Sequence, residues 1–154
     1  MVSRPQPTNL VVIDTIVIFR RREPDPNWDG TYARIVDAGQ PTPTALGLVE
    51  FTGAYLTTFG GLNDEAIEGH PLHGRGLVAY QAHVVLNSAW IAQAKQANSV
   101  HRDHRGGWHE RYNHYVLCFH DETFECIAKN WRAEELHCSM AEAIAIAATK
   151  LIER

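Results

Sequence analysis

Histidines are concentrated in one part of this chain, and histidine is the residue type best suited to chemistry near neutral pH. Eight of the nine histidines lie between His70 and His120. Imidazole titrates near neutrality, and it is also a common metal ligand. Glycine-rich loops flank the cluster. We therefore expect this segment to contain the working region of the protein, for proton transfer or for metal binding.

A β-hairpin is predicted over residues 112–132, and its register decides which side chains meet. If residues 120–123 form the turn, one face is apolar and consists of Tyr115, Leu117, Phe119, Phe124, Cys126 and Ala128. A slip of one residue would move every side chain to the other face, so the prediction depends on the turn. The same alternation places Cys118 and Cys126 on opposite faces, where they cannot form a disulfide.

The other face of this hairpin carries titratable residues within reach of one another. His114, His120 and Glu125 lie on it, and such an arrangement could transfer protons or bind a metal. We expect His70, His120 and Glu125 to act as acid/base residues. If a divalent metal such as zinc or iron is bound, the candidate ligands are His70, His114 and His120. The alternative is an ordinary half-solvated sheet face with its polar residues outward.

A glycine-rich loop, residues 69–76, precedes a predicted long helix over Leu77–Asn98. The helix prediction rests on apolar residues at helical spacing and on the absence of Gly and Pro from this stretch. The N–H groups at a helix N-terminus attract anions, and His73 and Arg75 in the loop would strengthen such a site. The loop matches neither a Walker motif nor a dinucleotide fingerprint. The alternative is that its glycines only allow tight turns.

Three further residues are candidates for ligand binding. Asn87 and Ser88 are polar residues in the middle of the predicted helix, so they need hydrogen-bond partners if they are buried. They could bind the polar edge of a ligand, or Asn87 could tie the helix to a neighbouring segment. Trp108 follows two glycines in a predicted polar loop, where it could cover a bound ligand. A solvated surface loop is the alternative.

The elements that must position these residues indicate an α+β domain. Strands are predicted over residues 10–20, 31–37 and 45–59, before the long helix and the hairpin. Ser139 and Glu142 form a capping box that begins a C-terminal helix. The expected order is β-β-β-α-β-β-α, an antiparallel sheet with one long central helix and a C-terminal helix.

Length and composition indicate one globular domain over residues 10–154, preceded by a proline-containing arm over residues 1–9. The net charge of −4 argues against nucleic acid or an anionic membrane surface as a partner. No apolar run is long enough to span a bilayer. The three cysteines form no CxxC pair, which argues against a thiolate zinc site and a disulfide framework. A cytoplasmic location is expected.

Several short strings between Phe51 and Trp131 form a recognisable set. They include Gly69-His70-Pro71-Leu72, Asn87-Ser88, Trp90-Ile91 and Phe119-His120-Asp121-Glu122-Thr123-Phe124-Glu125-Cys126. This set resembles a group of small uncharacterised bacterial proteins. The resemblance implies one compact domain of bacterial cytoplasmic origin, and it assigns no activity and no catalytic residue.

The sequence as a whole predicts a small enzyme-like domain that acts on or binds a polar small molecule, with Arg75 suited to an anionic group on it. The expected pocket lies between the glycine-rich loop, the start of the long helix and the His/Glu face of the hairpin. One alternative is a non-catalytic ligand-binding or protein-interaction module whose histidines are structural. Another is a homodimer whose histidines stabilise the interface.

Overall fold

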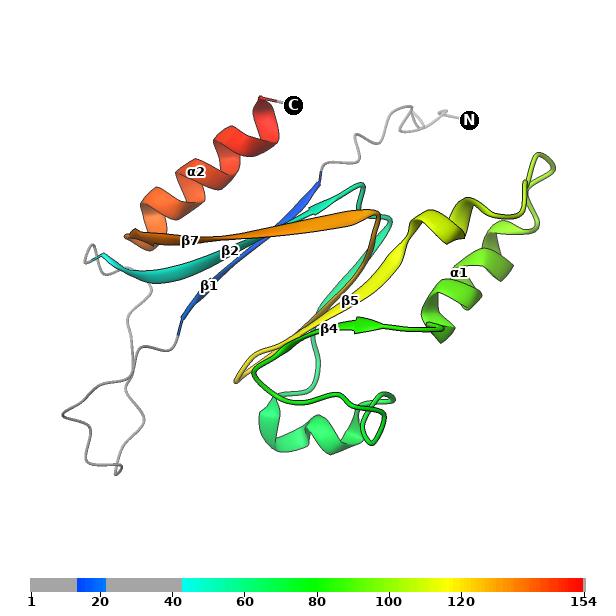
Figure 1. Ribbon diagram of the computed structural model, residues 1–154, viewed down its shortest axis with the longest axis horizontal. Coiled ribbons are helices and arrows are strands. Elements are labelled where there is room, and N and C mark those ends of the chain that lie inside the picture. Colours follow the sequence, from blue (N-terminus) through cyan, green and yellow to red (C-terminus); the bar gives the residue numbers. More distant parts are fainter. Residues whose placement is uncertain (1–13, 22–42, 154) are drawn as a thin grey trace, which may run out of the picture.

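The computed structural model describes residues 14–21 and 43–153, and it confirms the α+β class (Figure 1). The expected arm at 1–9 and the expected strand at 31–37 lie outside the described residues. The elements are β1 (Thr15–Arg20), β2 (Thr44–Thr52), β3 (Leu56–Gly60), the 3-10 helix η1 (Asp64–Gly69), β4 (Ala82–Val85), α1 (Ala89–Asn98), the 3-10 helix η2 (Trp108–Arg111), β5 (Asn113–Cys118), β6 (Thr123–Ala128), β7 (Asn130–Cys138) and α2 (Met140–Ile152). In the described part of the chain, no helix is both long and apolar enough to cross a membrane.

The strands form two antiparallel sheets, with the orders β1-β2-β7 and β3-β6-β5-β4. The chain passes between the sheets twice, from β2 to β3 and from β6 to β7. At the first passage Gly53 has a φ of +62°, a left-handed conformation that glycine adopts without a steric penalty. Its N–H donates to Asp14 Oδ1 at 2.6 Å, which fixes the bend to the start of β1.

The main core lies between the two sheets. Val49 and Phe51 of the first sheet are buried against Tyr115 and Phe124 of the second. The Phe51 ring packs at 5.4 Å, centroid to centroid, from each of the two aromatic rings. This contact joins the sheets and leaves the opposite face of β5 and β6 to be covered by other segments.

The hairpin of β5 and β6 has the predicted faces but not the predicted register. Leu117 pairs with Phe124 rather than with Cys126, and the connection covers residues 119–122. This offset of two residues preserves the faces because side chains alternate with a period of two. The predicted apolar face is therefore confirmed, and Cys118 and Cys126 lie on opposite faces as free thiols.

The C-terminal helix begins as predicted. Ser139 Oγ accepts the Glu142 N–H, and the Glu142 carboxylate accepts the Ser139 N–H, which completes the capping box. Ala143 and Ala147 are buried on one side of α2. Small side chains allow this helix to lie close to the first sheet, where Figure 1 shows it (red) beside β7 and β2.

The predicted long helix over Leu77–Asn98 is wrong in its first half. Residues 82–85 form β4, which pairs with β5, and the helix begins only after Ser88. Alternate residues of β4 face the same side as His114, and pairing with β5 outweighs the local helical spacing. The strand β7 was also missed beyond residue 132. Its side chains are mostly exposed and include several charges, so it lacks the apolar alternation of a buried strand.

Candidate functional site

Glu125 lies between two histidines on the outer face of the second sheet. Its Oε2 is 2.8 Å from His114 Nε2, and its Oε1 is 3.4 Å from His70 Nε2. The side chains of His114 and His70 are 4% and 7% exposed, whereas that of Glu125 is 21% exposed. His114 comes from β5, Glu125 from β6 and His70 from the segment after η1. The structure thus brings together His70 and Glu125, as predicted.

The hydrogen-bond partners assign the tautomers of both rings. The backbone N–H of Leu72 donates to His70 Nδ1 at 3.1 Å, so the proton of the neutral ring is on Nε2 and points to Glu125. An ionised carboxylate only accepts, so His114 also donates from Nε2. Its Nδ1 is then left as an acceptor. This nitrogen is 2.9 Å from Ser88 Oγ.

Ser88 occupies the turn between β4 and α1 and caps the helix. Its Oγ accepts the Ile91 N–H at 3.2 Å, which leaves the hydroxyl proton available for His114 Nδ1. The preceding residue, Asn87, has a φ of +53°, an uncommon conformation that this residue type tolerates better than most. The Trp90 ring packs edge-on against the His114 ring at 5.1 Å. The hydroxyl, the imidazole and the carboxylate therefore form a fixed chain of hydrogen bonds.

The carboxylate of this chain stays ionised. The hydrogen bond from His114 is the main cause that lowers the pKa of Glu125 below its usual value of 4.5, and partial burial opposes the shift. The Glu125 carboxylate lies beside His114 Nε2. A proton that moved from Ser88 Oγ to His114 Nδ1 would therefore form an imidazolium ion beside a carboxylate.

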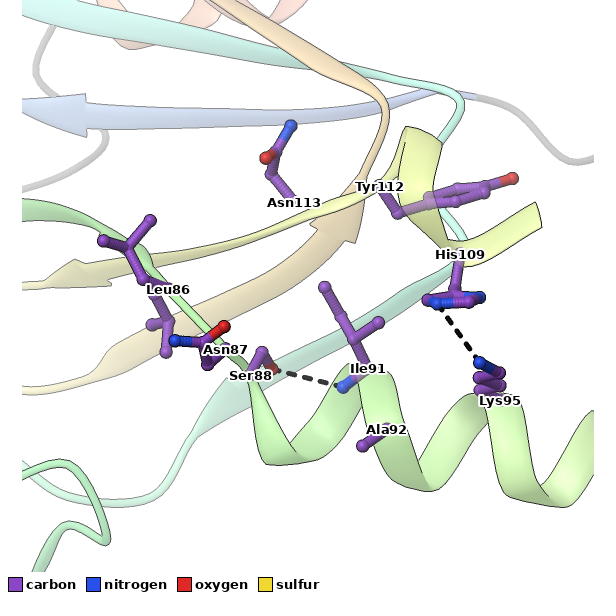
Figure 2. A pocket seen from close by; sticks show the side chains of 10 residues that line it. Leu86, Asn87, Ser88, Ile91, Ala92, Lys95, His109, Tyr112 and Asn113 are labelled. Carbon is purple, nitrogen blue, oxygen red and sulfur yellow. Dashed lines mark hydrogen bonds between the residues drawn. The ribbon is translucent and has the colours of Figure 1, made fainter. Parts of the chain in front are cut away.

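A cavity of about 490 Å³ opens beside this chain, between α1, the end of β4 and the start of β5. Figure 2 shows its lining side chains, with Ser88 at the start of α1 and Lys95 two turns further along. Asn87 and Ser88, two of the predicted ligand-binding residues, line it. The remaining lining residues are apolar side chains from β4, the turn after it and α1, and polar or aromatic side chains from α1, η2 and the start of β5: Val85, Leu86, Ile91, Ala92, Lys95, His109, Tyr112 and Asn113.

The far end of the cavity is suited to an anion. Lys95 Nζ is 3.4 Å from His109 Nε2, the contact drawn as a dashed line in Figure 2. A lysine ammonium can only donate, so His109 Nε2 accepts and the ring proton is on Nδ1. This buried Nδ1 has no hydrogen-bond partner among the residues that the structure describes. The Lys95 ammonium at this end of the cavity could hold a carboxylate or phosphate group.

The prediction that His120 joins this site is wrong. β5 ends at Cys118 and β6 begins at Thr123, so His120 lies in the connection between them and not on the sheet face that holds His114 and Glu125. Its side chain is 70% exposed, and its Nδ1 is 2.8 Å from Asp121 Oδ1. This hydrogen bond is the main cause that raises the pKa of His120 above 6.5.

The predicted anion site at residues 69–76 required a helix that begins directly after them. No helix follows residues 69–76, because the chain continues to β4. His73 and Arg75 are exposed, and neither lines the cavity beside Ser88. Trp108 does not line it either. Its ring packs against Tyr55 and Tyr112, at centroid distances of 4.9 and 5.4 Å.

The predicted zinc or iron site is not supported by the geometry. Within residues 14–21 and 43–153, no group of three or more His, Cys, Asp or Glu side chains is arranged to hold a metal ion. The Nε2 atoms of His70 and His114 both face Glu125, and both Nδ1 atoms accept hydrogen bonds. Neither ring therefore offers a free lone pair.

Two cavity residues, Lys95 and His109, were not predicted. Lys95 lies seven residues after Ser88, which is about two helical turns and therefore the same helix face. Both residues lie within the predicted helix Leu77–Asn98, so this spacing could have been found in the sequence. No protein-family model matches this chain, and neither a curated protein nor a solved structure matches it.

Proposed function

We propose that this protein binds a small molecule with an anionic group in the cavity along α1 and acts on it by proton transfer through His114. The observation that carries the proposal is the position of Ser88. It lines the cavity, and its hydroxyl meets an imidazole whose other nitrogen is held by Glu125. If Ser88 only capped α1, its hydroxyl would need no hydrogen bond to His114, and His114 would need none to Glu125.

The shape and chemistry of the cavity support this ligand class. Ile91 and Ala92 offer apolar surface between Ser88 and Lys95. Ligand cavities typically combine such a surface with a few polar groups that fix orientation. The Lys95 ammonium supplies the charge for an anion at one end, and Ser88 with His114 supplies the acid/base pair at the other.

Binding of octanoate, which has an apolar chain and one carboxylate, tests the proposal. We expect it to raise the melting temperature of the protein and to perturb NMR signals of α1. Lys95→Met should weaken binding about tenfold, because it removes a charge-assisted hydrogen bond. Lys150→Met is the matched control, since Lys150 lies on α2 and pairs with Glu134. Equal binding by both variants, or no binding to the wild type, would contradict the proposal.

A protein-interaction module, including a homodimer, is the second candidate function. The observation that favours it is the exposure of large apolar side chains on edge strands. Phe59 on β3 is 67% exposed, and Trp131 on β7 is 49% exposed. Light scattering after size-exclusion chromatography tests it. A wild-type mass of twice 17.3 kDa that drops to the monomer mass in the Phe59→Ser variant would support the homodimer. A monomer mass at all protein concentrations would exclude it.

The cytoplasmic location expected from the sequence remains a proposal. The free thiols of Cys118, Cys126 and Cys138 are compatible with a reducing compartment. Fractionation of cells that express the tagged full chain would test it.

A further inference from the structure

We infer that Ser88 is the nucleophile of an esterase reaction, with His114 as its general base and Glu125 as the group that orients and stabilises His114. The inference rests on the proposed function, because it needs a ligand in the same cavity. Its geometric basis is one continuous chain of contacts. Ser88 Oγ is 2.9 Å from His114 Nδ1, and His114 Nε2 is 2.8 Å from Glu125 Oε2.

The local structure around Ser88 favours an activated hydroxyl. One lone pair of Oγ accepts the Ile91 N–H at the helix start, which leaves the other lone pair for attack. The positive end of the α1 dipole stabilises negative charge that develops at this position. The first N–H groups of an α-helix lack intrahelical acceptors. Those of Ala89 and Trp90, the first two residues of α1, can therefore donate to the oxygen of a substrate carbonyl.

The reaction balances with water as the second substrate. Ser88 Oγ bonds to the ester carbonyl carbon, and its proton passes to His114 Nδ1. The bond from that carbon to the alcohol oxygen then breaks, and the alcohol leaves with the proton from Nδ1. Water next attacks the acyl carbon while giving a proton to Nδ1, and Ser88 Oγ leaves and recovers a proton from the same nitrogen. One ester and one water become one acid and one alcohol, with no change in oxidation state.

The cavity specifies the kind of ester. Lys95 is seven positions after Ser88, which corresponds to about 10 Å along the axis of α1. Ile91 and Ala92 line the cavity between them with apolar side chains, and Lys95 and His109 lie in contact at the far end. The substrate class is therefore a carboxylic ester whose acyl chain ends in an anionic group about 10 Å from the reacting carbonyl.

Labelling of the full chain with a fluorophosphonate probe tests the nucleophile directly. Ser88 Oγ would bond to phosphorus, fluoride would leave, and the hydroxyl proton would pass to His114. We expect one adduct by intact mass and its location on the peptide that contains Ser88. Ser88→Gly should abolish it, because glycine removes the hydroxyl and is still tolerated as the N-cap of α1. Ser99→Ala, at the exposed end of α1, should label like the wild type.

Hydrolysis of two esters tests the role of the cavity. We expect the mono-nitrophenyl ester of suberic acid to be hydrolysed faster than nitrophenyl octanoate. Lys95→Met should remove about a tenfold preference in kcat/KM for the charged ester. Glu125→Gln should lower kcat for both esters and leave KM within about twofold, since Glu125 acts through His114 rather than on the ligand.

The outcomes separate this inference from the proposed function. Octanoate binding without an adduct at Ser88 would overturn the nucleophile and leave the binding function intact. An adduct on another residue, or equal labelling of Ser88→Gly, would also overturn it. Absence of both binding and labelling would overturn the two proposals together.

Discussion

Removal of the Glu125 carboxylate tests how far the buried hydrogen-bond chain stabilises the fold. Glu125→Ala leaves the Nε2–H groups of His114 and His70 without their acceptor, at sites that are 4% and 7% exposed. A buried donor without a partner costs about 1–3 kcal/mol. The bond to His70 is long, at 3.4 Å, so its loss falls at the lower end of this range. We expect a total loss of about 3 kcal/mol in the free energy of unfolding.

Urea unfolding at pH 7 measures this loss. With a slope of about 2 kcal/mol per molar, the midpoint should fall by about 1.5 M. Glu135→Ala is the matched control, because Glu135 pairs with Arg21 at 2.6 Å with both side chains well exposed. Such a surface pair contributes roughly 0.5 kcal/mol. If the two variants lost the same stability, the buried chain would not have the energetic role assigned to it.

The pH dependence of the same variants follows from the lowered pKa of Glu125. A carboxyl whose pKa is lower in the folded state stabilises the fold above its unfolded value, here about 4.5. That contribution disappears as the pH falls through the lower, folded value. Glu125→Gln has no such titration, so the stability difference between wild type and this variant should shrink below about pH 4.5. A constant difference from pH 7 to pH 3 would refute the assigned ionisation.

Two further predictions concern groups outside the site. Burial raises the pKa of the Cys126 thiol to about 12 and also raises that of Cys118. Of the three cysteines, only the partly exposed Cys138 should therefore react with iodoacetamide in the folded protein. Peptide mass mapping measures which cysteine is modified. Modification of Cys126 at the same rate would contradict its burial. The pKa of His120 should lie above 6.5 by NMR titration and should fall in Asp121→Asn. An unchanged value would mean that the Asp121 hydrogen bond is absent in solution.

The sequence by itself determined the parts of the structure that depend on local periodicity and local hydrogen bonds. The alternation along residues 112–132 identified the faces of β5 and β6, including the face that holds His114 and Glu125. It did so despite a register error of two residues, because side chains repeat with a period of two. The capping box of Ser139 and Glu142 likewise involves only residues within one helical turn, so it was visible in the sequence.

Only the tertiary structure decided which of these residues form a site. His70 reaches Glu125 across 55 positions of the chain, and Ser88 reaches His114 across 26. No local sequence pattern predicts a contact between residues that lie so far apart along the chain. Pairing with β5 makes residues 82–85 of the predicted helix a strand, β4, and α1 begins only after its N-cap, Ser88. This long-range pairing is the physical reason that a serine predicted inside a helix instead lies at its first turn, against an imidazole and a cavity.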